Sequence, residues 1–135
     1  MDDLAAFITA RLDEDEAMAH AAAQAFAAEW RSADRGVFNG GVRLADAAFA
    51  RMAAHIARHD PARVLREAAA KRAIVAAHRP VLHHDEDAGS ACCAAETAFD
   101  VYAKAEPWPC PTIRAIAAVW SDHPDYRAQW APGHG

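Results

Sequence analysis

The chain has 135 residues, enough for one domain with a core that needs no disulfides. Alanine is abundant and only 6 residues are glycine, so the composition favours helices. The formal charge of −5 argues against a non-specific nucleic-acid binder, which needs a basic face to meet phosphates.

The first predicted element is a helix that starts at Asp2 and Asp3, since carboxylates at a helix N-terminus accept free backbone N–H groups. Apolar residues recur along it at helical spacing as far as Trp30. The periodicity then stops, and Asn39-Gly40 lies between short apolar pairs. This pattern indicates a short β-hairpin or an ordered loop near residues 35–43.

Two further helices are predicted with almost no loop between them. The second covers about residues 44–58. Asp60 followed by Pro61 is typical of an N-cap and a first helical residue, so a third helix is expected from Pro61 to about His78.

The remaining elements are predicted from the polar and proline-rich segments that separate them. Residues 79–89 form a polar loop, and Ser90 is a suitable cap for a fourth helix over about 91–104. Prolines around Cys110 end that helix, and a fifth follows over about 112–120. The prediction is therefore a mainly α protein, a single domain over residues 1–135 built as a small bundle of about five helices, with a loose tail from about residue 131.

The sequence also bears on location. No apolar run approaches the roughly 20 residues that a membrane-spanning helix needs. The opening Met1-Asp2-Asp3 lacks the basic region of a signal peptide. Three cysteines, two of them adjacent, are a poor disulfide framework and favour reduced thiols. A cytoplasmic protein without a membrane segment is expected.

Several motifs resemble those of a large actinobacterial and actinophage family of small proteins of unknown function. They are His55-Ile56-Ala57-Arg58-His59-Asp60-Pro61-Ala62-Arg63-Val64-Leu65, Cys110-Pro111-Thr112 and Asp122-His123-Pro124-Asp125-Tyr126. The resemblance implies a shared origin but no activity. It also implies a ligand set like that of a structural zinc site, a His followed by Cys-x-x-Cys and the Cys of Cys-Pro-Thr. This chain departs from that pattern, because Glu96 stands where the second Cys is expected.

The residues themselves suggest the same site. His78, Cys93 and Cys110, with Glu96 or Cys92 as the fourth ligand, are donors that zinc accepts in tetrahedral geometry. If 91–104 is helical, Cys93 and Glu96 lie one turn apart and face one point. The competing interpretation is that the cysteines are small buried apolar residues.

Other candidate sites are weaker. A His/acid cluster at 83–87 could bind divalent metals, although a solvated loop is the simpler interpretation. His55 and His59, four apart, are favoured as a helix end rather than as metal ligands. Cys110 could also act as a nucleophile with His78 or His123 as its base.

We expect a non-catalytic accessory or protein-interaction module, with a structural zinc as an option. Its partner is expected to be a protein, and exposed tryptophans would favour a homodimer. One alternative is a thiol- or metal-dependent enzyme that uses Cys110 and a nearby His. The other is nucleic-acid binding through the basic third helix, which carries Arg63, Arg66 and Lys71.

Overall fold

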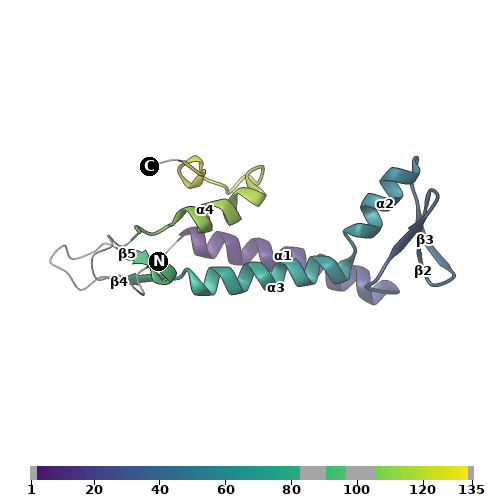
Figure 1. The fold of residues 1–135 in the computed structure, drawn as a ribbon, viewed down its shortest axis with the longest axis horizontal. Helices are drawn as coiled ribbons and strands as arrows, with labels where there is room; N and C mark the ends of the chain where they lie inside the picture. Colours follow the sequence, from purple (N-terminus) through teal and green to yellow (C-terminus); the bar gives the residue numbers. More distant parts are fainter. Residues whose placement is uncertain (1–2, 83–90, 97–105, 134–135) are drawn as a thin grey trace. The chain divides into compact units, whose positions relative to one another are not determined.

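The computed structural model describes residues 3–82, 91–96 and 106–133 (Figure 1). The α-helices are α1 (Asp3–Ala25), α2 (Ala50–Arg58), α3 (Pro61–Ala77) and α4 (Pro111–Ala117). The strands are β1 (Arg31–Ala33), β2 (Gly36–Asn39), β3 (Val42–Asp46), β4 (Pro80–Leu82) and β5 (Ala91–Cys93). Three short 3₁₀ helices complete the set, η1 (Ala94–Glu96), η2 (Ala118–Trp120) and η3 (Ala128–Trp130).

The chain divides into two compact units. Unit 2 is the continuous segment Leu12–Ala70, and unit 1 combines Met1–Arg11 with Lys71–Gly135. The boundaries fall inside α1 and at the middle of α3, so each of these helices contributes residues to both units.

Unit 2 contains an antiparallel sheet in the order β1-β2-β3, and α2 covers one of its faces (Figure 1). Val37 of β2 is fully buried with Ala53 and Ala57 of α2, and Trp30 and Ile56 pack around them. Phe38 follows Val37 in β2, and because successive side chains of a strand point to opposite faces, Phe38 lies on the other face of the sheet. There the guanidinium groups of Arg31 and Arg43 lie over its ring, 5.3 and 4.9 Å from the centroid.

The β2–β3 connection is the expected hairpin. Asn39 pairs with Val42 across a turn in which Gly40 has φ +55°. This left-handed conformation is what a tight hairpin turn requires and what glycine adopts without strain.

Asp60 fixes the junction between α2 and α3. One carboxylate oxygen accepts a hydrogen bond from the backbone N–H of Arg63 at 2.8 Å, which caps α3. The other accepts the backbone N–H of Trp30 at 3.0 Å, and the N–H of Ala62 donates to the carbonyl of Ala28 at 3.0 Å. The predicted third helix and its Asp60-Pro61 start are therefore confirmed.

The C-terminal segment of unit 1 closes on the start of α1. The Phe7 ring lies 5.1 Å from Trp130, 6.0 Å from Tyr126 and 5.8 Å from His123, measured between centroids. Arg11 is buried, and its Nη1 lies 3.1 Å from His123 Nδ1. Tyr126 and Trp130 therefore pack against α1.

The predicted bundle of about five helices is wrong. In the part of the chain that the structure describes, four α-helices accompany two small antiparallel sheets, so the fold is mixed. The predicted second helix starts at Ala50 rather than near residue 44, because residues 42–46 pair with β2. The first helix ends at Ala25, before Trp30.

The predicted fourth helix is also wrong where the structure describes it. Residues 91–93 form β5, which pairs with β4, and Cys92 bridges to Pro107. Pairing between distant segments has overridden the local helix preference of an alanine-rich stretch. The Ser90 cap and the 83–87 cluster lie outside the described residues.

Among the described residues, no helix combines the length and apolar character that crossing a membrane would need.

Candidate metal centre

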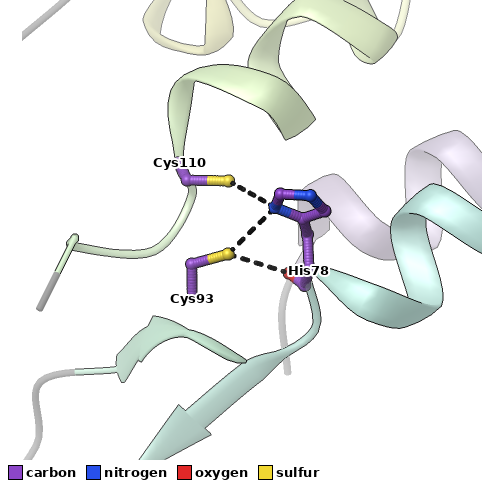
Figure 2. Close-up of side chains that lie close together, drawn as sticks. All are labelled: His78, Cys93 and Cys110. Atoms are coloured by element: carbon purple, nitrogen blue, oxygen red, sulfur yellow. Dashed lines mark hydrogen bonds between the residues drawn. The ribbon is translucent and has the colours of Figure 1, made fainter. Parts of the chain in front are cut away.

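Three segments of unit 1 bring together His78, Cys93 and Cys110 (Figure 2). His78 directly follows α3, and its N–H donates to the carbonyl of Ile74 at 3.0 Å, in continuation of the helical pattern. Cys93 is the last residue of β5. Cys110 is the N-cap of α4, immediately before Pro111 at the first helical position. Regular structure on all three sides fixes where these side chains lie.

The donor atoms converge on one point. His78 Nδ1 lies 3.2 Å from Cys93 Sγ and 3.5 Å from Cys110 Sγ, and all three atoms lie within 4.8 Å of one another. Around a tetrahedral zinc, Zn–S and Zn–N bonds would separate N from S by about 3.5 Å and S from S by about 3.8 Å. The two N–S distances are close to the zinc value, and the two sulfurs, which lie within 4.8 Å of each other, would need to approach by at most about 1 Å.

Two thiol sulfurs approach one imidazole nitrogen, and Cys93 Sγ also lies 3.8 Å from the carbonyl oxygen of His78. A neutral imidazole Nδ1 either donates one proton or accepts with one lone pair, so it forms one good hydrogen bond. Here two sulfurs point at the same nitrogen, as Figure 2 shows. Cys93 and Cys110 both have 0% exposure, so solvent water does not offer their sulfur atoms a further hydrogen bond. A cation between the three donors would satisfy them together.

The fourth ligand is constrained by the strand. Successive side chains of a strand point to opposite faces, so Cys92 faces away from Cys93. Cys92 Sγ instead lies 3.5 Å from the carbonyl oxygen of Val81 on β4. This removes Cys92 as a ligand. Glu96 ends η1, and its side chain lies outside what the structure describes. Cys93 and Glu96 do not share one helical face as predicted, because Cys93 ends a strand.

The other histidines have different surroundings. His59 is the C-cap residue of α2, and its Nδ1 lies 2.9 Å from the carbonyl oxygen of His55, so the pair forms a helix end as predicted. His123 Nδ1 accepts the N–H of Asp125 at 3.1 Å and faces Arg11. His78 is therefore the histidine that the described structure places beside Cys110.

Two basic side chains of α3 contact other residues of the chain. Arg63 forms an ion pair with Glu67 at 2.7 Å, and Lys71 Nζ lies 5.2 Å from the ring centroid of Trp120. Nucleic-acid binding through this helix stays a prediction.

Arg11 is the important residue that sequence reasoning missed. It is 8% exposed, lies 5.3 Å over the Phe7 ring and approaches the Asp125 carboxylate at 3.8 Å. The available signal was its position, because Arg11 interrupts the apolar stripe of α1 four residues after Phe7. A charge in an apolar stripe indicates a buried partner elsewhere in the chain.

Comparison with known proteins gives a family but no activity. No curated protein and no solved structure matches this chain. A family of unknown function, DUF6221, matches residues 1–132, which is nearly the whole sequence. The chain therefore belongs to DUF6221.

Proposed function

We propose that this protein is a non-catalytic accessory module whose unit 1 is held together by a structural zinc ion bound to His78, Cys93 and Cys110. The observation that carries the proposal is the convergence of two buried sulfurs on one imidazole nitrogen. Thiolate and imidazole donors at tetrahedral spacing suit zinc better than the hard cations magnesium and calcium, which prefer oxygen.

A metal would supply what the local structure lacks. β4 and β5 have three residues each, and α4 has seven. Isolated elements of this length are marginal in water. One ion bound to the end of α3, to β5 and to the start of α4 would link them, and its binding free energy would become folding free energy.

Burial favours a structural role over a catalytic one. Cys110 Sγ and His78 Nδ1 are 3.5 Å apart, a distance that also suits a thiol activated by imidazole. A nucleophile must reach its substrate, and Cys110 is 0% exposed. Structural zinc is held by four protein ligands, so this role requires a fourth beside the three that converge here, and Glu96 is the ligand we propose for it.

Metal content tests the proposal directly. The full chain is purified reduced and without a histidine tag, and its zinc is measured by elemental mass spectrometry. We expect about one zinc per chain. Cys93→Ser and Cys110→Ser should lose the zinc and lower the melting temperature. Cys92→Ser is the matched control, since its sulfur faces the other side of β5, and it should keep the metal.

Two results would overturn the assignment. The first is wild-type protein without metal that keeps its melting temperature after prolonged chelation. The second is full zinc content in Cys93→Ser and Cys110→Ser. Mild acid offers an independent check, because zinc ligation requires deprotonated thiols and unprotonated imidazole, so acid should release the ion.

The accessory role implies a protein partner. Phe49 and Met52 are 57% and 47% exposed, and together with Arg51, His55 and Ile56 they line a surface groove of about 450 Å³. Such apolar exposure supports association with another chain, either a second copy or a different protein. Light scattering across a range of concentrations separates these two, because only a homodimer would show twice the mass of the chain. A cytoplasmic setting and an actinobacterial or phage origin rest on the sequence alone.

A further inference from the structure

The two cysteines of the candidate metal centre are also placed to react with each other. We propose that Cys93 and Cys110 form a redox switch, in which oxidation joins their sulfurs as a disulfide, expels the metal and frees His78. The release of metal rests on the proposed zinc site, whereas the disulfide itself rests on the positions of the sulfurs.

The geometry selects this pair among the three cysteines. Cys93 Sγ and Cys110 Sγ both contact His78 Nδ1 and lie within 4.8 Å of each other, so a bond of about 2.05 Å requires a movement of less than about 3 Å. Side-chain rotation moves a sulfur over this range. Cys92 is held on the opposite face of β5, next to the Val81 carbonyl. Of the two adjacent cysteines, Cys93 can form a disulfide with Cys110 while β5 stays paired with β4, whereas Cys92 cannot.

The chemistry balances with hydrogen peroxide, an oxidant small enough to reach the buried sulfurs when the short segments around them open locally. A zinc-bound thiolate attacks one oxygen of hydrogen peroxide, the O–O bond breaks, and a sulfenic acid forms at that cysteine. The second thiolate then attacks the sulfenic sulfur, the S–S bond forms, and hydroxide leaves. Overall, two thiolates lose two electrons, the peroxide gains them, two protons are taken up, two waters form, and Zn²⁺ departs.

The switch would change which segments are connected. With metal, the centre links the end of α3, β5 and the start of α4. A disulfide would keep Cys93 of β5 joined to Cys110 of α4 and would leave His78 without its ligand bond. The consequence is selective, since the ligand bond to His78 at the end of α3 is lost, whereas β5 and α4 stay joined and β4 stays paired with β5.

The test uses the reduced full chain, with its zinc content measured before any oxidant is added. Hydrogen peroxide is titrated in, released zinc is followed with a chromogenic chelator, and disulfides are mapped by mass spectrometry of proteolytic fragments. We expect a Cys93–Cys110 disulfide to appear in proportion to released zinc, and dithiothreitol with added zinc to reverse both. Cys92→Ser should behave like the wild type, because it removes the one cysteine outside the pair.

The outcomes separate this inference from the proposed function. Zinc that stays bound, or that leaves while the cysteines become sulfinic acids or Cys92 pairs instead, would overturn the switch and leave the structural zinc standing. Protein that never contained zinc would refute the zinc site and the metal release with it. In that case the disulfide is tested on the oxidised metal-free chain. A Cys93–Cys110 disulfide would support the pairing of these two cysteines, and free thiols would refute it.

Discussion

Replacement of Asp60 by Ala tests the junction on which unit 2 depends. The carboxylate accepts two backbone N–H groups, from Arg63 at 2.8 Å and from Trp30 at 3.0 Å. Loss of an N-cap costs about 1 kcal/mol. A part-buried N–H that loses its acceptor costs roughly another 1 to 2 kcal/mol. We therefore expect Asp60→Ala to lower the free energy of unfolding by about 2 to 3 kcal/mol.

The assay is urea unfolding of the full chain, followed by far-ultraviolet circular dichroism. Asp60→Asn retains one acceptor oxygen, whereas its NH₂ group meets a donor, so it should lose about half as much free energy as Asp60→Ala. Asp122→Ala removes an exposed carboxylate and should change stability by less than about 0.5 kcal/mol. The reasoning is refuted if Asp60→Ala matches the wild type, or if Asn is as damaging as Ala.

Three other contacts give predictions in the same urea assay. Arg11→Met retains an aliphatic stem but loses the hydrogen bond to His123, and should cost about 1 to 3 kcal/mol. Gly36→Ala would place a methyl group 2.6 Å from Phe38 Cζ, which displaces the ring from its guanidinium contacts and should cost about 1 to 2 kcal/mol. Trp130→Ala empties a buried site and should cost about 3 to 5 kcal/mol, whereas Trp130→Phe should cost clearly less. An unchanged unfolding midpoint in any of these variants would show that the contact does not stabilise the fold.

Features encoded by neighbouring residues were predictable. The start of α3 follows from Asp60 and Pro61, because capping and a fixed proline φ act within one turn. The β2–β3 turn follows from Asn39-Gly40, since few residues adopt the required positive φ. In both cases the physical cause lies within a few residues of its effect.

Features that depend on pairing between distant segments could not be predicted from the sequence. β5 consists of Ala91, Cys92 and Cys93, which include no β-branched or aromatic side chain, and it forms through its pairing with β4 and Pro107. The same holds for the candidate site. Ligand chemistry and the family resemblance indicated His78, Cys93 and Cys110, which the structure brings together. Cys93 and Glu96 were expected on one face of a helix, but Cys93 lies in a strand. Ligand identity could be predicted from residue types, whereas their local geometry could not.

The closure of the C-terminal segment on α1 has a consequence for biosynthesis. Unit 2 is continuous in sequence, so all of its segments are available once residue 70 has left the ribosome, whereas Phe7 must wait for Trp130, 123 residues further along the chain. Until then the ring of Phe7 lacks its partners Tyr126 and Trp130. A chain released early would expose the start of α1 to chaperones and proteases, so quality control would distinguish finished molecules from incomplete ones by their first helix.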